Sequence, residues 1–437
     1  MYLPPNVLYC IDTLEQAGFP CYAVGGCVRD ALLGLTPHDY DLCTAAPPEI
    51  TARIFAAHTL VRSGEKHGTI GVVLEGQVYE ITTFRTEGDY LDSRHPSWVE
   101  FVDDINQDLS RRDFTVNAMA YSPTRGYADP FGGQQDLKNK VLRAVGDPHK
   151  RFSEDALRIL RGVRFAVRYG LSVENATKNA MFNLAPLMER LARERVFDEL
   201  CKLFPLVSAQ DLLEFAPIVT QVIPELAPQV GFDQKNPHHK YDIFTHTAHV
   251  VEASPRDLPL RWAALLHDAG KPGCFTLDEN GRGHFLGHAG VGAEMANGIL
   301  QRLKAPTDLR ERVVLLIKQH MTPIEPERKH IRRFLSRLGA QTLEQLLLLQ
   351  EADMGSKGTG IPTDHARFDR IRALIAEIET DNACLSIKDL AINGHDLLAL
   401  GYQGPAIGQA LQSLLEQVLD EKIENEKTAL LAALKEQ

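Results

Sequence analysis

The chain has 437 residues, which is too long for one ordinary hydrophobic core, so we expect two to four domains. Its apolar content of 44% and charged content of 24% are typical of soluble globular proteins, and no apolar run approaches the roughly 20 residues that span a bilayer. The net charge of −11 argues against a nonspecific nucleic-acid coat. Seven cysteines without C-x-x-C spacing, and an N-terminus without a signal-peptide pattern, favour a cytoplasmic protein with reduced thiols.

Strand signals are confined to the first 145 residues or so. Residues 21–24 form a short apolar run that ends at two glycines, and two β-branched runs within residues 69–84 flank a Gly-containing turn, which predicts a hairpin. The polar stretch 85–107 has no periodicity and predicts a mobile loop. From about residue 147 onward the hydrophobic period is near 3.6, which predicts helices.

The fold class predicted from these signals is α+β. A small mixed sheet with helices forms a head, and everything after it is helical. Prolines 224 and 228, the run K-N-P-H-H-K and the run G-S-K-G-T-G-I-P mark boundaries within the helical part. The predicted domains are a head, a helical neck, a helical domain and a helical tail, over residues 1–145, 146–235, 236–357 and 358–437.

One segment is basic although the whole chain is acidic. Between Arg143 and Lys202 there are twelve Lys and Arg but only eight Asp and Glu. A basic strip in an acidic protein can bind a nucleic acid at one place. The charge count alone is explained more simply by a solvated helix surface.

The stretch A-V-G-G-C-V-R-D-A-L-L-G-L-T-P-H-D-Y-D-L combines a phosphate cradle with metal ligands. Gly25 and Gly26, between a strand and a helix, let the backbone approach an anion, and Arg29 can add a charged donor. Asp39 and Asp41, two apart on a predicted strand, project from one face and can hold one or two Mg²⁺ ions. Each element alone is common in turns, but together they predict a two-metal phosphoryl or nucleotidyl transfer site.

These residues carry a family resemblance. G-G-x-V-R-D followed by D-x-D resembles the class II tRNA nucleotidyltransferases, or CCA-adding enzymes, and their bacterial poly(A) polymerase relatives. L-S-R-R-D-F-T-V-N-A-M-A, D-P-F-G-G, E-D-A-L-R-I-L-R and E-R-V-F-D-E-L resemble the second to fifth family motifs. The resemblance covers roughly residues 20–205, and A-I-N-G-H-D-L-L-A-L-G in the tail resembles the family's C-terminal region. It implies a catalytic head, a neck that carries a base-reading helix and a tail that binds tRNA.

The fourth motif can also be interpreted from its helical geometry. Wound as a helix, residues 154–168 separate into an apolar arc and a polar arc. An amphipathic surface helix explains both arcs, but it does not explain why four of the six polar positions are arginine. The apolar arc holds Ala156, Ile159, Leu160, Val163, Ala166 and Val167, and the polar arc holds Glu154, Asp155, Arg158, Arg161, Arg164 and Arg168.

The resemblance implies that Asp155 and Arg158 pair with the incoming base. A carboxylate only accepts and a guanidinium only donates, so the pair suits C and A and leaves buried groups unpaired with U or G. Arg112, Arg161 and Arg164 would hold the nucleotide near its phosphates, and the role of Arg111 stays open. Glu80 is either a third carboxylate near the metals or a surface residue of the hairpin. The segment 90–96 resembles the flexible loop of members that add the terminal A.

Eight of the sixteen histidines lie between His238 and His320. T-H-T-A-H-V, L-L-H-D-A-G-K-P and E-A-D-M-G resemble the HD phosphohydrolase superfamily. The resemblance implies an HD-type domain over residues 236–357 and a second divalent metal of unknown identity. Any single histidine here is explained better as a packed helix-face residue; it is the adjacent His267 and Asp268, with partners upstream and downstream, that favour the HD-type domain. The implied ligands are His246, His267, Asp268 and Asp353, with His288 and His320 as candidates for a further metal or for phosphate contacts.

The main hypothesis is that the chain adds the 3′-terminal CCA to tRNA from CTP and ATP with Mg²⁺ and releases pyrophosphate. A related alternative is an A-adding enzyme or a poly(A) polymerase, although the basic stretch of the polymerases after the fourth motif is missing. Alternatives of other classes are an HD phosphohydrolase with an RNA-binding N-terminal half, and a non-catalytic RNA-binding protein. Intact Asp39 and Asp41 argue against both of these.

Overall fold

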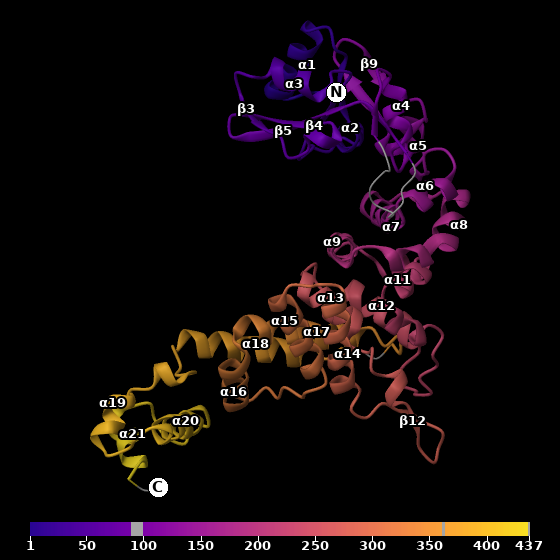
Figure 1. Cartoon of the computed structure of the whole chain (residues 1–437). Helices are drawn as coiled ribbons and strands as arrows, with labels where there is room; N and C mark the ends of the chain where they lie inside the picture. The colour runs from indigo at the N-terminus through magenta and orange to yellow at the C-terminus, as the bar shows by residue number, and fades with distance from the viewer. Residues whose placement is uncertain (89–98, 361–362, 436–437) are drawn as a thin grey trace. The chain divides into compact units, whose positions relative to one another are not determined.

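The computed structural model describes residues 1–88, 99–360 and 363–435. Its fold is α+β, as predicted, with a seven-stranded mixed sheet in the N-terminal part and helices in the remainder (Figure 1). By its internal contacts the chain divides into two compact units. The first comprises Met1–Leu206 and Glu214–Pro224, and the second comprises Val207–Leu213 and Glu225–Gln437. The segment 90–96, expected to act in A addition, lies outside the described residues.

The large sheet places β2 beside the glycine-containing turn. β1 runs antiparallel to β2 with Val24 opposite Asp41, and β2 runs parallel to β5 with Leu42 opposite Ile81. The first residue of β2 therefore lies next to the end of β1. In spatial order the strands are β3 (Thr59–Val61), β4 (Thr69–Leu74), β5 (Gln77–Thr83), β2 (Asp41–Thr44), β1 (Cys21–Val24), β8 (Ala120–Ser122) and β9 (Gly126–Ala128).

The predicted hairpin is confirmed as β4 and β5. Leu74 faces Gln77 across a two-residue turn, Glu75 and Gly76, both with positive φ (50° and 80°). Such turns match the right-handed twist of the strands. Along β5 the buried and exposed side chains alternate, and Glu80 is on the exposed side.

The prediction of a loop over residues 85–107 is partly wrong. β6 (Arg85–Glu87) pairs antiparallel with β7 (Val99–Phe101), and α4 (Ile105–Ser110) begins within the stretch. The Asp104 side chain accepts a hydrogen bond from the Asn106 N–H and so caps α4. Strands of three residues are too short to show alternation, so the sequence pattern could not indicate them.

Helices cover the sheet and bury its core. α1 (Pro5–Gln16) and α3 (Pro48–Ile54) lie side by side against the strands (Figure 1). α2 (Gly26–Leu32) and α5 (Gly133–Lys138) both contact the 3₁₀ turn η2 (Thr115–Asn117). The second family motif is thus held between the glycine turn and the third motif.

The rest of the first unit is mainly helical, although the short strand β11 pairs with β10 where only helices were predicted, and one predicted helix start is wrong. The helix expected from Glu154 begins only at Leu157, because Asp155 has extended backbone angles (φ −141°, ψ 104°) and separates two helices. α7 packs on α9, and α6 packs on α8. The elements are β10 (Val141–Leu142), α6 (Pro148–Glu154), α7 (Leu157–Tyr169), β11 (Ser172–Val173), α8 (Asn175–Leu184), η3 (Ala185–Arg190), α9 (Arg193–Leu203) and α11 (Ala216–Val222).

The second unit is built on a bundle of helices around the fully buried Trp262. α14 packs along α15, and α12, α13 and α17 contact one another. The two short strands β12 and β13 pair antiparallel. The elements are α10 (Ala209–Glu214), η4 (Pro224–Gln229), α12 (Ile243–Ala253), α13 (Leu258–Leu266), η5 (Pro272–Cys274), β12 (Thr276–Leu277), β13 (Gly283–His284), α14 (His288–Arg302), α15 (Thr307–Gln319), α16 (Arg328–Leu338), α17 (Ala340–Gly355) and α18 (His365–Thr380).

The end of the chain has an apolar cluster of its own. It begins at Cys384 and ends at Leu434, whereas α18 packs against α16 and α17. Its elements are η6 (Ile387–Asp389), α19 (Gly394–Ala399), α20 (Pro405–Leu419) and α21 (Lys427–Ala433). Within the described residues, no helix combines the length and the apolar character that crossing a membrane requires.

Candidate functional site

Three carboxylates line one cleft at the edge of the large sheet. The cleft has a volume of about 690 Å³ and is lined by residues 38–41, by residues 77–80 of β5 and by Pro4. Asp41 is the first residue of β2, so Asp39 lies just before the strand rather than on it as expected. Both still line this cleft, and Glu80 joins them from the exposed side of β5.

The groups around Asp41 shift the pKa of its carboxyl group. The protein atoms around it raise the pKa of Asp41, the Arg112 guanidinium lowers it, and the Asp39 carboxylate raises it again. Oxygen ligands that repel one another are a suitable donor set for a hard divalent cation, because the cation removes the repulsion.

A second cleft, rich in arginine, adjoins the first. It has a volume of about 440 Å³, and Asp41 lines both clefts. Seven of the eight residues predicted to bind nucleotide line it, which leaves only Arg164 outside. Its lining is Gly25, Gly26, Arg29, Asp41, Arg111, Arg112, Asp113, Asn117, Asp155, Leu157, Arg158, Arg161, Phe165 and Arg195.

Gly25 makes room for an arginine. Its φ of +77° is one that side chains rarely adopt, and a Cβ there would lie 2.9 Å from Arg112 Nη1. Its own N–H donates to the Met119 carbonyl oxygen at 2.9 Å. The glycine therefore leaves room for Arg112 beside Asp41, and the approach of its backbone to a phosphate stays a prediction.

Arg29 is held by other side chains. Its Nε and Nη2 donate to Asp30 Oδ1 at 2.9 and 2.7 Å, Nη1 donates to Asn117, and Nη2 also donates to Tyr169 Oη at 2.6 Å. The Arg29 side chain is only 7% exposed. Most of its donors are thus used inside the protein.

The two predicted base readers both line the arginine-rich cleft. Asp155 Oδ1 accepts from the Leu157 N–H at 3.0 Å, and Oδ2 accepts from Arg195 Nη2 at 2.8 Å. Arg158 Nη1 donates to Glu154 Oε2 at 2.7 Å. Sequence reasoning did not single out Arg195, although it lies within the fifth motif.

Arg164 lies elsewhere than expected. Its Nε donates to Glu199 Oε2 at 2.6 Å, both side chains are less than 10% exposed, and its guanidinium stacks on the Phe165 ring. This ion pair joins α7 to α9 inside the neck. We therefore do not assign Arg164 to the nucleotide.

Asp113 anchors the arginine-rich cleft and was also missed. Arg161 Nη2 lies 2.7 Å from Asp113 Oδ2, and Asn117 Nδ2 donates to Asp113 Oδ1 at 3.1 Å. Burial by itself raises the pKa of Asp113, but Arg161 and Asn117 lower it to about 2. Asp113 and Asn117 both belong to the second motif, which was the only signal in the sequence.

We predict that Asp113→Asn lowers the free energy of unfolding by about 2 kcal/mol at pH 7. Since the folded-state pKa is depressed, this stabilisation is present above the ordinary aspartate pKa of 3.8 and is lost as the pH falls through about 2. Denaturant titrations at pH 7 and pH 2.5 measure the difference. The control is Asp198→Asn, at an exposed position; equal stability losses for Asp113→Asn at both pH values would contradict the prediction.

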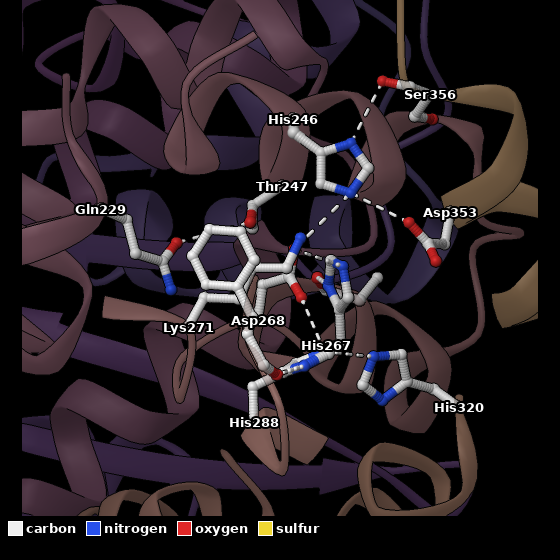
Figure 2. A network of polar contacts seen from close by, with 12 residues as sticks. Gln229, His246, Thr247, His267, Asp268, Lys271, His288, His320, Asp353 and Ser356 are labelled. Atoms are coloured by element: carbon white, nitrogen blue, oxygen red, sulfur yellow. Dashed lines mark hydrogen bonds and ion pairs between the residues drawn. The ribbon is translucent and has the colours of Figure 1, made fainter. Parts of the chain in front are cut away.

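Four histidines of the second unit, His246, His267, His288 and His320, converge on Asp268 (Figure 2). His246 Nε2 lies 3.0 Å from Asp353 Oδ1, and His267 Nε2 lies 3.2 Å from Asp268 Oδ2. Ligand atoms of His246, His267 and Asp268 all lie within 4.8 Å of one another, and those of Asp268, His288 and His320 do as well. Asp268 therefore belongs to two adjacent groups, each with the geometry to hold a cation.

The ring orientation of these histidines has a common local cause. The Nδ1 atoms of His267, His288 and His320 each contact the carbonyl oxygen three residues earlier, at 2.6–2.8 Å. His246 Nδ1 contacts the Ser356 carbonyl oxygen at 3.1 Å. With Nδ1 occupied, each ring presents Nε2 to the centre, as in many metal sites.

The donor set of this centre fits a divalent metal. Within the described residues, the buried atoms His246 Nε2 and His267 Nε2 have no hydrogen bond of proper geometry. Asp268 Oδ2 is paired with the Lys271 ammonium 2.7 Å away. Burial, together with the neighbouring His267, lowers the pKa of His320 to about 4, so its ring is neutral at pH 7. Burial lowers the pKa of His267, but Asp268 and Asp353 outweigh burial and raise this pKa, so a bound cation would have to displace a proton there. Imidazole nitrogens and a carboxylate are ligands for borderline cations.

A mixed sheet that brings paired aspartates and an arginine-rich cleft to one edge, with a helical neck behind it, defines a nucleotidyltransferase. The family model of the Poly A polymerase head domain matches residues 21–143, the model of the RNA and SrmB-binding site of polymerase A matches residues 170–229, and the model of tRNA nucleotidyltransferase domain 2 matches residues 284–434. This class of transferase depends on divalent metal ions.

Comparison of whole chains narrows the class to one family. The chain is 34% identical to the CCA-adding enzyme of Levilactobacillus brevis (97% of this chain and 96% of the relative), and 33% identical to that of Streptococcus sanguinis (99% and 97%). The crystal structure of Bacillus stearothermophilus CCA-adding enzyme in complex with CTP superposes with a TM-score of 0.75 at 29% identity, over 99% of this chain and 98% of that one. The chain belongs to the CCA-adding enzymes, which confirms the resemblance found in the sequence.

Proposed function

We propose that this enzyme adds CCA to the 3′ end of tRNA from CTP and ATP, without a nucleic-acid template. The observation that carries the proposal is the position of Asp41, which lines both the carboxylate cleft and the arginine-rich cleft. A group held at Asp41 can act on a nucleotide in one cleft and on a primer end in the other. The substrates follow from the family, whose solved structures include complexes with CTP, ATP and tRNA.

Asp39 and Asp41 would hold Mg²⁺, with Glu80 as a third carboxylate near it. When bound, Mg²⁺ would polarise the α-phosphate and lower the pKa of the attacking hydroxyl. The tRNA 3′-hydroxyl oxygen bonds to the α-phosphorus, and the bond to the β-phosphate oxygen breaks. Arg112, beside Asp41, would stabilise the charge that develops on the departing pyrophosphate.

Base selection would come from the helix start at α7. Asp155 accepts and Arg158 donates, which matches the amino group and ring nitrogen of cytosine and adenine. With U or G the same two groups would face like partners and stay unpaired, at a cost of orders of magnitude in selectivity. Arg195, which donates to Asp155, would hold the carboxylate in its reading position.

Each predicted domain would have its own role in the reaction. We assign catalysis to the head (1–145), base reading to the neck (146–235), metal binding to the HD-type domain (236–357) and tRNA contacts to the tail (358–437). We place the reaction in the cytoplasm, where the environment is reducing, because none of the seven cysteines forms a disulfide bond.

A groove of about 910 Å³ where α16 adjoins the tail supports tRNA binding there. α16, η6 and α20 line it, and its lining combines apolar side chains (Leu385, Ile387 and Leu415) with cations (Arg333, Arg337 and Lys388) and one carboxylate, Glu416. Cations beside apolar side chains suit phosphates beside unstacked bases.

Reversing the charge at this groove should weaken tRNA binding selectively. We expect Arg337→Glu combined with Lys388→Glu to raise the KM for tRNA about tenfold at 0.15 M salt and to reduce the salt dependence by about two phosphate contacts. The KM for CTP should not change. Initial rates at several salt concentrations measure this, with Lys318→Glu as the control at an exposed position; an unchanged KM for tRNA would exclude the groove.

The decisive assay offers three tRNA transcripts, which end at the discriminator base, after C and after CC. Each is incubated with single nucleotides and with CTP plus ATP. Growth by three residues supports the proposal. Extension of the CC-ended transcript alone indicates an A-adding enzyme, and a long ladder of A indicates a poly(A) polymerase.

A second activity is supported by the histidine cluster. His246, His267, Asp268 and Asp353 would hold a divalent metal, with His288 and His320 beside a further position. Lys271 and Lys357 line the adjoining cavity of about 230 Å³. Lys271 is already paired with Asp268 at 2.7 Å, so we assign phosphate binding to Lys357. We propose metal-dependent hydrolysis of phosphomonoesters or 2′,3′-cyclic phosphates here. Release of phosphate from such substrates in the presence of Mn²⁺, Co²⁺, Ni²⁺ or Mg²⁺ tests it.

A further inference from the structure

A direct contact joins the glycine turn to the end of the base-reading helix. Arg29 belongs to α2, which follows the turn, and its Nη2 donates to Tyr169 Oη at 2.6 Å. The Arg29 guanidinium carbon also lies 4.3 Å from the centre of the Tyr169 ring. Tyr169 is the last residue of α7, so Arg29 connects the C-terminal end of that helix to α2 and the glycine turn.

A second path reaches the same helix two turns earlier. Arg29 Nη1 donates to Asn117 Oδ1, and Asn117 Nδ2 donates to Asp113 Oδ1 at 3.1 Å. Asp113 Oδ2 in turn lies 2.7 Å from Arg161 Nη2. Both paths begin at the Arg29 guanidinium, so one side chain holds α7 at two points.

We propose that Arg29, Asn117 and Tyr169 are positioning residues that fix the base-reading helix relative to the reacting phosphate and thereby set nucleotide selection. The inference rests on the proposed function. The base would bind at the start of α7, and the α-phosphate would bind at the carboxylates of the head. A shift of α7 would therefore move the base relative to the α-phosphate. A misplacement of about 1 Å can cost on the order of 10²-fold in rate.

The competing role for Arg29 is direct binding of a phosphate through its charge. The two roles differ in what lysine can replace. Arg29→Lys keeps the charge and can still pair with Asp30, but a lysine ammonium lacks the planar fork that reaches Asn117 and Tyr169 together. Positioning requires the fork, whereas phosphate binding requires mainly the charge.

The test measures kcat and KM for CTP and for UTP on a tRNA that ends at the discriminator base. Tyr169→Phe keeps the ring over Arg29 and removes only the hydroxyl that accepts its hydrogen bond. We expect the preference for CTP over UTP to fall about tenfold or more, since one hydrogen bond to a charged group is lost. The KM for tRNA should stay unchanged. The lost hydrogen bond should lower the melting temperature slightly, but a loss of stability alone would reduce the rates with CTP and UTP equally and leave the preference unchanged.

Three comparisons complete the design. Tyr127→Phe, on β9 and outside both clefts, is the matched control and should retain the wild-type preference. Arg29→Lys should lose preference as Tyr169→Phe does. The double variant should lose no more of the preference for CTP over UTP than Arg29→Lys alone, because both changes remove the same contact between Arg29 and Tyr169.

The outcomes separate this inference from the proposed function. If the wild-type chain adds no nucleotide, the proposed function fails and this inference fails with it. If the wild type adds CCA and Tyr169→Phe keeps the full preference for CTP, only the positioning role is wrong. Full activity of Arg29→Lys would also overturn the positioning role. So would a double variant whose loss of CTP preference equals the sum of the losses in the two single variants.

Discussion

Asp41→Ala is expected to lower the rate of CTP and ATP addition to tRNA by on the order of 10³-fold, since in the proposed mechanism it removes a ligand from metal ions that contribute several kcal/mol to the transition state. The loss should appear in kcat, because the base readers and the arginine-rich cleft remain. Primer extension under single-turnover conditions measures it.

The same substitution should leave the fold intact or make it more stable. The protein environment and the Asp39 carboxylate both raise the pKa of Asp41, so its ionised form is disfavoured where it stands. Thermal unfolding of Asp41→Ala and of the exposed control Asp12→Ala tests this. Full addition by Asp41→Ala would refute the metal assignment, and a large fall in melting temperature would point to a structural role.

His267→Ala is expected to have the second largest effect, on the other centre. Outer partners of metal ligands already change affinity about 10–100-fold, so loss of a direct ligand should weaken divalent metal binding at least about 100-fold. CCA addition should not change, because His267 lines neither cleft of the head. Metal content after dialysis, measured by mass spectrometry, gives the stoichiometry.

His249→Ala is the matched control, since it lies one turn after His246 on α12 and outside the cluster. Asp353→Asn serves as a second variant because it keeps the size of the side chain and removes only its charge. Metal retained at wild-type affinity by both His267→Ala and Asp353→Asn would contradict the site.

The local features of the head could be predicted from the sequence because short-range rules govern them. The β4–β5 hairpin follows from two β-branched runs around Glu75 and Gly76, and the glycine turn follows from an apolar run that ends at Gly25. Asp39 and Asp41 share a cleft even though only Asp41 is on the strand.

Contacts between elements could not be predicted in this way. Helical periodicity placed Arg164 on the polar arc, but its partner Glu199 comes from α9, and only the packing of α7 on α9 brings the two together. Asp155 Oδ1 caps the start of α7 locally, but the partner of its other oxygen is Arg195, which lies 40 residues further on. A periodic pattern carries no information on such partners.

The position of Asp41 between two clefts has a consequence for inhibitor design. A compound that joins a nucleotide analogue to a mimic of the tRNA 3′ end would occupy both clefts at once, and the second half would bind at a high effective concentration. Neither half alone would gain this advantage. The shared carboxylate thus makes the enzyme a suitable target for bisubstrate ligands, in which the linker replaces the bond that the reaction forms.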